Sequence, residues 1–266
     1  QIRNYMKDIP SMFYYNAICV ISDLSSNKAG TITSGLDRFM EWKTKDGDYE
    51  NTAYAQFDTF YEGMFQKARL LDILKNFILF SGDGQKPIKI LAGYHQYFAV
   101  RKAIEKAKIA TKTDGKGGVF WHTQGSGKSL TMVMLAKTIL MELKDCHPRV
   151  VIVTDRKELD AQIAATFAHT RLTPARATSG RHLVELVNSA RADVITSIIN
   201  KFNTVERQEV KNPSRDIFVL VDESHRSNYG LMATRMRSVF PNACYIGFTG
   251  TPLMKSEQYT MARFGR

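Results

Sequence analysis

The sequence predicts an α/β protein: a parallel sheet with helices on both faces, preceded by a smaller α+β segment. Two observations predict this class. From about residue 89 onward, short apolar runs alternate with helical stretches, which is typical of βαβ units. Before that point the pattern is mixed. The length of 266 residues corresponds to roughly one or two domains.

The first part contains one expected strand and one long expected helix. Residues 13–22 (FYYNAICVIS) are rich in aromatic and β-branched side chains and predict a strand, with a loop or hairpin tip over 25–33. Residues 54–80 predict a helix, because apolar side chains recur at steps of three and four. A linker is expected at 81–86 (SGDGQK), so the expected divisions are 1–50, a helical connector over 51–86, and 87–266.

The second part supplies the alternating elements. Strands are expected at 118–122, 150–154, 193–199, 217–221 and 244–248. Helices are expected at 96–108, 127–143, 158–167, 180–188 and 231–239.

Charge narrows the classes of function. The chain has 37 Lys and Arg against 26 Asp and Glu, a formal net charge of +11. Residues 1–90 hold 11 basic and 11 acidic residues, so the whole excess falls on residues 91–266. This excess indicates a polyanionic partner, most simply nucleic acid, with a diffusely basic domain as an equally open alternative.

Hydropathy and cysteine usage argue against a membrane protein, a disulfide-rich secreted protein and a zinc protein. No apolar run approaches the roughly 18 residues of a membrane helix, and no signal pattern opens the chain. Three scattered cysteines without a C-x-x-C argue against a disulfide framework or a zinc site and favour the reducing cytoplasm. The sequence neither starts with Met nor ends on a closing element, so we expect it to be a piece of a longer protein.

A glycine-rich stretch, HTQGSGKS at 122–129, predicts a phosphate loop. It follows a strand-like run and precedes a helix-like one, so the glycines and the helix N-terminus form a nest for anions. Lys128 can reach the β- and γ-phosphates, and the Ser129 hydroxyl can bind Mg²⁺. The pattern departs from the usual motif because His122 stands where a glycine is common; a chance flexible loop is the alternative. The remaining candidate nucleotide contacts within the loop are Thr123, Gly125, Ser126 and Gly127.

An acidic pair ends a buried strand 94 residues after the loop lysine. The run IFVLVDESHRS places Asp222 and Glu223 at the carboxyl edge of the sheet, where open α/β sheets bind ligands. Asp222 can hold Mg²⁺, and Glu223 can orient or deprotonate the attacking water. The alternative is a strand that ends in a solvated acidic turn.

Four further stretches carry weaker signals. In GFTGTP, the hydroxyls of Thr249 and Thr251 can link the phosphate site to an adjoining surface, although a simple strand-ending turn is preferred for this motif alone. TDRKELDAQ (154–162, with Arg156) and TSIINKF (196–202, with Thr196 and Ser197) suit contacts to a nucleic-acid backbone, or are polar caps. Gln96, in YHQYFAV, can read an adenine edge, or is an exposed helix residue.

In this order, the phosphate loop, the DExH-type box and T-G-T resemble a superfamily 2 helicase-like ATPase. The chain is also similar to the motor (R) subunit of type I restriction–modification enzymes. The segments that carry this similarity are WHTQGSGKS, VDESHRS, GFTGTPL, LAGYHQYFAV, RFMEWKT and LLDILKNFILF. The resemblance implies a RecA-like domain over 87–266, ATP and Mg²⁺ as cofactors, and movement along duplex DNA before cleavage. It also implies modification and specificity subunits as partners, and no membrane.

The resemblance assigns further residues. His225, with Thr249 and Thr251, would couple the γ-phosphate to the DNA-tracking surface. Gln1 and Tyr5 match the Q-x-x-x-Y element that ends the family's nuclease domain, which would occupy 1–50, while the nuclease's metal-binding carboxylates would lie upstream. Because the family completes its ATP site with arginines from a second RecA-like domain, this chain alone is expected to bind nucleotide with negligible turnover.

Three other functions stay open at this point. A helicase or remodelling translocase without a nuclease differs only in lacking upstream carboxylates. A nucleotide-dependent assembly module would lack DNA-stimulated ATP hydrolysis. A non-enzymatic DNA-binding protein would have no use for Lys128, Ser129, Asp222 and Glu223 in this order.

Overall fold

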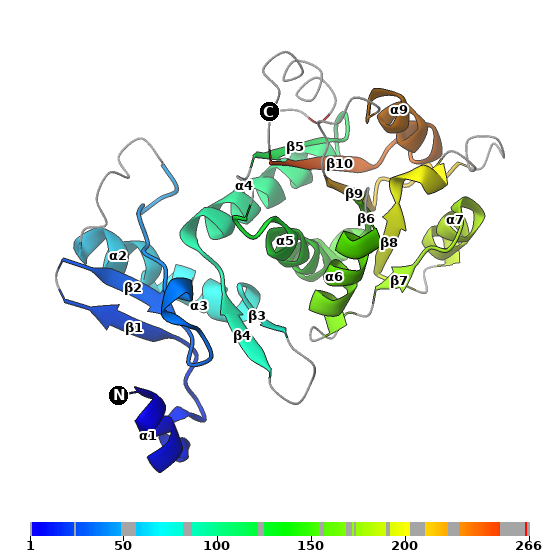
Figure 1. The fold of residues 1–266 in the computed structure, drawn as a ribbon. Helices are drawn as coiled ribbons and strands as arrows, with labels where there is room; N and C mark the ends of the chain where they lie inside the picture. Colours follow the sequence, from blue (N-terminus) through cyan, green and yellow to red (C-terminus); the bar gives the residue numbers. More distant parts are fainter. Residues whose placement is uncertain are drawn as a thin grey trace. The chain divides into compact units, whose positions relative to one another are not determined.

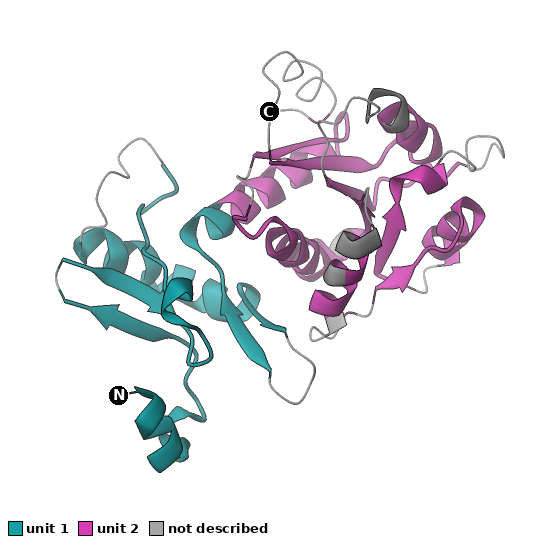
Figure 2. Cartoon of the chain, viewed as in Figure 1, with its two compact units in different colours: residues 1–98 teal, residues 99–266 magenta. Residues whose placement is uncertain are grey.

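The computed structural model divides the chain into two compact units, residues 1–98 and 99–266 (Figure 2), and the division falls within helix α4 (Tyr94–Ala110). The structure describes residues 2–23, 25–48, 57–81, 87–121, 125–154, 157–168, 172, 174–189, 192–202, 211–222, 229–250 and 264. Over these ranges no helix is long and apolar enough to cross a membrane. The identity of residues 1–50 as the end of a nuclease domain, and of 51–86 as a connector, stays a prediction.

The first unit is a small α+β fold built on two antiparallel hairpins (Figure 1). One hairpin joins β1 (Cys19–Ser22) to β2 (Asn27–Gly30), and the other joins β3 (Ile78–Ser81) to β4 (Ile88–Leu91). The helical elements are α1 (Ile2–Asp8), η1 (Pro10–Phe13), η2 (Leu36–Arg38), α2 (Phe57–Met64) and α3 (Lys67–Asn76). Buried Trp42 lies against the rings of Tyr97 and Phe98, with centroids 5.7 and 5.8 Å away, which gives this unit an aromatic core.

Three expectations for this unit are wrong in detail. Within 13–22 only Cys19–Ser22 is a strand, because Pro10 starts a 3-10 turn that takes up Phe13. The loop or hairpin tip expected at 25–33 includes the turn of the β1–β2 hairpin, but it also contains strand β2. The helix expected over 54–80 is two helices followed by β3; Gln66 caps the second helix by accepting from Arg69 N–H at 2.8 Å, and Ile78–Ser81 pair with β4 instead. The linker at 82–86 lies outside the described residues.

The second unit is the predicted parallel sheet, with six strands in the order β5-β10-β9-β6-β8-β7. Its strands are β5 (Lys116–Trp121), β6 (Arg149–Thr154), β7 (Ala175–Arg176), β8 (Val194–Ile198), β9 (Ile217–Asp222) and β10 (Cys244–Thr249). Five of the six agree with the predicted strands to within two residues, and β7 was not predicted. The helical elements besides α4 are α5 (Lys128–Glu142), η3 (Lys144–Cys146), α6 (Lys157–Ala168), α7 (Gly180–Ser189), η4 (Ile199–Lys201) and α9 (Tyr229–Val239).

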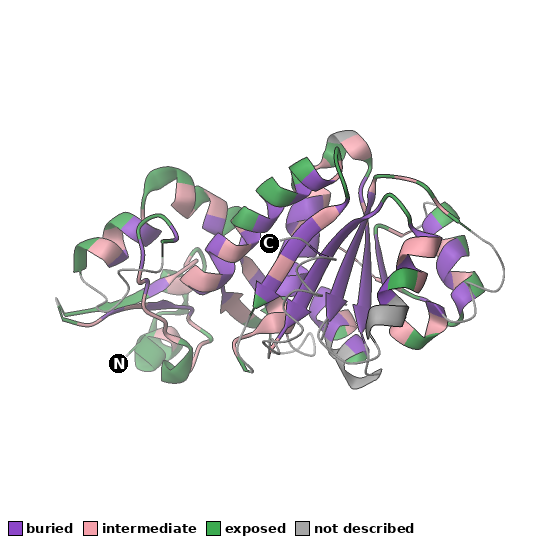
Figure 3. Ribbon diagram, turned by 90° about the horizontal axis from the view of Figure 1, so that it is seen from above, coloured by how far each residue is buried: buried purple, intermediate pink, exposed green. Residues whose placement is uncertain are grey.

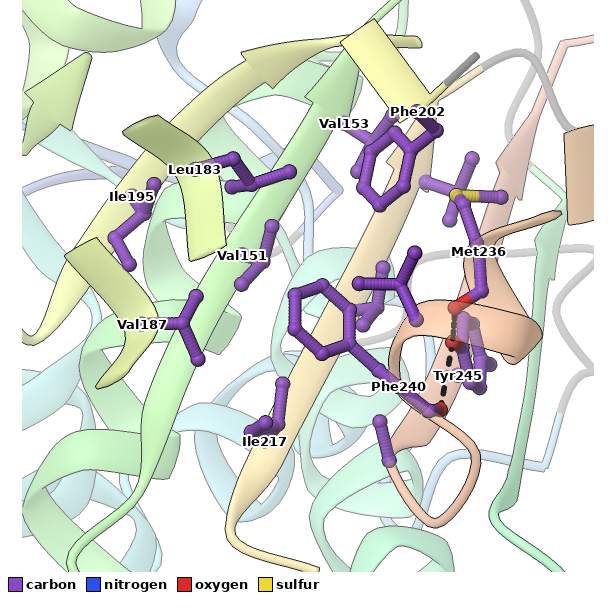
Figure 4. Packing of buried hydrophobic residues seen from close by; sticks show 14 of the residues in the cluster. Val151, Val153, Leu183, Val187, Ile195, Phe202, Ile217, Met236, Phe240 and Tyr245 are labelled. Atoms are coloured by element: carbon purple, nitrogen blue, oxygen red, sulfur yellow. Dashed lines mark hydrogen bonds between the residues drawn. The ribbon is translucent and has the colours of Figure 1, made fainter. Parts of the chain in front are cut away.

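Both faces of this sheet are covered, and its central strands are buried along their length (Figure 3). On one face α7 and α9 pack against alternate residues of β6, β9 and β10, such as Val151, Val219 and Tyr245 (Figure 4). The buried Tyr245 hydroxyl lies 2.8 and 2.9 Å from the carbonyl oxygens of Met236 and Phe240, which fixes the end of α9 to the sheet. Helices α5 and α6 contact β6 and contribute nothing to that cluster, so they cover the opposite face.

Candidate functional site

Strand alternation directs Asp222 toward the helix that follows the glycine-rich loop. Val219 and Val221 of β9 face the α7 and α9 side, so Asp222, the last residue of the strand, faces α5. Lys128 is the first residue of α5. Because all six strands are parallel, the end of β9 and the loop after β5 lie at the same edge of the sheet.

The structure brings the two predicted motifs together at this edge. The Lys128 Nζ lies 2.8 Å from Asp222 Oδ1, and only 1% of the Asp222 side chain and 18% of the Lys128 side chain are exposed. Two charges taken out of water at this distance interact strongly, because the low dielectric of the interior does not screen them. The geometric condition for a shared phosphate site, lysine beside the strand-end carboxylate, is therefore met.

The glycines give the loop a backbone that other residues rarely adopt. Gly125 has φ +84° and Gly127 has φ +83°, both in the left-handed region that favours glycine. A Cβ added at Gly125 would meet nothing within 4 Å, so open space lies beside the loop. Gly127 is the N-cap of α5 and, as a glycine, has no side chain to cap that end. The first turn of the helix thus presents the positive end of its dipole at the loop, as an anion site requires.

A metal or cofactor at this site would be held by few protein groups. Within the described ranges no group of three or more His, Cys, Asp or Glu residues is close enough to hold a metal ion. The Ser129 hydroxyl, one residue after Lys128, and the Asp222 carboxylate are the oxygen donors that Mg²⁺ prefers. This donor set fits Mg²⁺ bound together with a phosphate ligand, whose oxygens and waters complete the coordination.

The remaining candidates at this edge are only partly described. Thr249 ends β10 next to Phe248, which is the register partner of Asp222, and its side chain is buried. Thr123, Glu223, His225 and Thr251 lie outside the described residues, as does Arg156 of the first backbone motif. Their roles stay predictions.

Two predicted DNA contacts lie in the interior of a strand. Thr196 and Ser197 belong to β8 and each is 1% exposed. Their contact with DNA stays a prediction. The exposed Asn200 follows within the same motif.

The first unit holds the two other candidates. Gln96 is 4% exposed, so the exposed-helix alternative for this residue is wrong; its Oε1 accepts a hydrogen bond from Gly93 N–H at 3.0 Å. An adenine contact through this amide stays a prediction. Tyr5 lies on α1 and is 45% exposed, whereas Gln1 lies outside the described residues.

Sequence reasoning missed one charged cluster in the second unit. Asp160 of α6 is buried and pairs with Arg176 of β7 at 2.6 Å between Oδ2 and Nε. Asp160 lies inside the TDRKELDAQ motif, but nothing in the spacing pointed to Arg176, because a two-residue strand has no apolar run.

A parallel sheet, a left-handed glycine loop that opens a helix, and that loop's lysine on a strand-end carboxylate together define a phosphate-loop nucleotide-binding domain of the helicase-like kind. The chain belongs to the SWI2/SNF2 ATPase family, whose model matches residues 95–266. The UvsW helicase of bacteriophage T4 shares the fold, with 18% identity, a TM-score of 0.53, and coverage of 74% of this chain and 64% of that one.

Closer relatives are restriction enzymes. The chain is 33% identical over 99% of its length to a putative type I restriction enzyme MjaIXP endonuclease subunit from Methanocaldococcus jannaschii. It is 34% identical over 100% of its length to the type I restriction enzyme HindI endonuclease subunit from Haemophilus influenzae. It spans only 27% and 28% of those two proteins. The family resemblance that the motifs indicated is thereby confirmed.

Proposed function

We propose that this chain carries the nucleotide-binding half of the motor in an ATP-dependent type I restriction endonuclease subunit. The observation that carries the proposal is the ion pair between Lys128 and Asp222, which joins the two halves of a phosphate site across 94 residues of sequence. In this role the chain binds Mg·ATP and couples its hydrolysis to movement along duplex DNA before cleavage. Such an enzyme would act in the cytoplasm.

Nucleotide binding exchanges the partners of this ion pair. Lys128 would leave Asp222 for the β- and γ-phosphates, and Asp222, with the Ser129 hydroxyl, would face Mg²⁺. One cation beside the carboxylate is thus replaced by another, so Asp222 stays charge-compensated in both states. Mg·ATP, when bound, supplies the phosphoryl group whose transfer to water provides the energy for movement.

The catalytic and coupling roles fall on neighbouring residues. Glu223 directly follows Asp222 and would orient the attacking water. His225, Thr249 and Thr251 would report the state of the γ-phosphate to the DNA-tracking surface. Gln96 would contact the adenine. The basic excess of residues 91–266 supports duplex DNA as the track, with modification and specificity subunits as partners in the whole enzyme.

Nucleotide binding can be measured on this chain through its own fluorescence. The sequence has two tryptophans; Trp42 is 2% exposed in the first unit, and Trp121, 66% exposed, ends β5 next to the phosphate loop. Mg·ATP is expected to change the emission of Trp121, and the change should be retained in Trp42→Phe and absent in Lys128→Ala. A Trp42→Phe chain that gives a saturable signal with Lys128→Ala in place would contradict the assigned site.

The motor role requires the full-length subunit. We expect its ATP hydrolysis to be stimulated by duplex DNA, and its DNA affinity to fall steeply with salt and to vary little with sequence. Hydrolysis without DNA stimulation would favour a nucleotide-dependent assembly module. Stimulated hydrolysis without DNA cleavage by the assembled enzyme would favour a translocase that lacks nuclease activity.

A further inference from the structure

A second buried aspartate lies on helix α6 and pairs with β7, the strand at the end of the sheet order farthest from β5. Asp160 of α6 is 1% exposed, and its Oδ2 lies 2.6 Å from Nε of Arg176 on β7. The Arg176 side chain is 54% exposed. One partner of the pair is therefore fixed in the interior, while the other reaches the surface.

The pair joins the two motifs that the sequence assigned to a nucleic-acid backbone. Asp160 belongs to TDRKELDAQ, which follows β6. Arg176 is the register partner of Thr196, which belongs to TSIINKF at the end of β8. The Thr196 hydroxyl is buried and has no hydrogen-bond partner among the described residues. Arg176 thus contacts both motifs from strand β7, which belongs to neither of them.

The geometry of the pair suits recognition of a phosphate group. A guanidinium group has about five N–H donors in one rigid plane, and Asp160 engages the Nε side of it. The Arg176 side chain as a whole is 54% exposed, so part of it is open to a ligand. The contact is electrostatic, since neither carboxylate oxygen of Asp160 has a hydrogen-bond partner among the described residues. A buried carboxylate at this distance still restricts where the guanidinium group lies, which favours a contact of its other N–H groups with phosphate oxygens.

We propose that Arg176 contacts the phosphate backbone of duplex DNA and that Asp160 is the positioning residue that orients it. This inference rests on the proposed function and goes beyond it, since neither residue carries a role in the motifs. It adds a charged contact to this region, where the predicted Thr196 and Ser197 side chains are buried and the Arg176 side chain is 54% exposed.

The first test counts phosphate contacts. Binding of the chain to a short labelled duplex is measured at several salt concentrations between about 50 and 200 mM, and log affinity is plotted against log salt. Arg176→Gln is expected to make the slope less steep by about 0.9, the value for one phosphate contact. A loss of stability alone would not change this slope. An unchanged slope contradicts a phosphate contact by Arg176.

The second test asks whether Asp160→Asn strengthens or weakens DNA binding. If Asp160 acted only through its charge, Asp160→Asn would strengthen DNA binding, because a negative charge near the polyanion is removed. If it orients Arg176, the same substitution weakens binding, by about tenfold for a charge-assisted contact that loses its geometry. Glu185→Gln is the matched control: Glu185 pairs with Arg181 on exposed α7, at 3.1 Å, and its loss should leave binding unchanged or tighter. Equal or tighter binding by Asp160→Asn contradicts the proposal.

A third variant covers the case in which Asp160→Asn does not fold. Arg176→Lys keeps the charge at a half-exposed position and loses only the fork, so affinity should fall with the salt slope retained. An affinity equal to wild type contradicts the proposal. A wild-type chain with no salt-dependent DNA binding contradicts the proposed function together with this site, whereas a wild-type chain that binds, with all three variants unchanged, contradicts this site alone.

Discussion

Two buried aspartates form ion pairs beside the same sheet. Asp222, at the end of the middle strand β9, belongs to the middle pair, and Asp160, which contacts the edge strand β7, belongs to the edge pair. Asp222 and Asp160 each pair with a basic side chain, at 2.8 and 2.6 Å. They differ in the partner: the Lys128 side chain is 18% exposed, whereas that of Arg176 is 54% exposed. In the proposed function the middle pair, which is closed in this structure, opens when the nucleotide binds. The edge pair already presents its cation, so a ligand can add to it without breaking it.

The largest expected effect concerns the closed pair. Lys128→Ala should weaken Mg·ATP binding by about 100-fold or more, because a charge-assisted contact to phosphate is worth roughly 3 kcal/mol. Isothermal titration calorimetry on the purified chain measures the affinity. Lys144→Ala, which removes an exposed lysine beyond the other end of α5, is the control and should bind as wild type. Equal losses in both variants would show that general charge, rather than the ion pair, sets the affinity.

The second prediction compares the stabilities of the two pairs without ligand. Lys128→Ala should lower the free energy of unfolding by roughly 3 kcal/mol, because it leaves Asp222 charged and buried. Arg176→Gln should cost only about 1 kcal/mol, since removing a half-exposed side chain admits water to Asp160. Urea unfolding followed by circular dichroism gives both values. The reverse order would contradict the distinction between a closed and an open pair.

A third, smaller effect concerns the left-handed backbone of the glycine-rich loop at the middle site. Gly125→Ala meets no atom within 4 Å, so its cost is confined to the left-handed conformation, about 1–2 kcal/mol of unfolding free energy. The new methyl group would also stand in the open space beside the loop and weaken nucleotide binding. Melting temperature and nucleotide titration separate the two effects. A variant with unchanged stability would contradict the left-handed geometry of this residue.

The smallest effect lies in the core at the other end of the middle strands, at Cys244, the first residue of β10. Burial raises the pKa of the Cys244 thiol from 9.0 to about 12, opposed by Arg237 and assisted by Asp114. The thiol therefore ionises in the unfolded chain before it does in the folded one, so its contribution to stability is complete below pH 9 and declines above it. The decline is at most about 1.4 kcal/mol per pH unit. Urea titrations at pH 8 and pH 10 should show a weaker pH dependence for Cys244→Ala than for wild type, with Cys146→Ala as control.

The sequence predicted the middle of the sheet better than its edge, and hydrophobicity explains why. β6, β9 and β10 are buried on both faces, so each one is a nearly continuous apolar run in the sequence. β7 has two residues, one of them a half-exposed arginine, and its position is set only by pairing with β8. No local pattern can reveal such a strand. In the first unit, LLDILKNFILF has helical spacing throughout, yet its last residues form β3 because β4 offers a partner.

The candidate site follows the same division between the middle and the edge of the sheet. The proximity of Lys128 and Asp222 could be predicted, because each belongs to a motif with a known place in a parallel sheet, and the ion pair agrees with it; their roles stay predictions. Thr196 and Ser197 were predicted within a strand over 193–199, which is correct, but the sequence does not show that both faces of this strand are covered and both side chains buried. Arg176 could not be found, since its partner lies on a helix 16 residues away in the chain and only the folded sheet brings them together.

The strand order also decides when the nucleotide site can exist during folding. Among the described strands, β5, which leads into the phosphate loop, pairs with β10, the last strand of this sheet in chain order. Until residues 244–249 insert between β5 and β9, β5 has no partner in the described sheet. We expect a chain that stops short of these residues to hold the phosphate loop less firmly. Affinity for nucleotide would therefore serve as a late checkpoint of chain completion, and ligand would stabilise only molecules that had passed it.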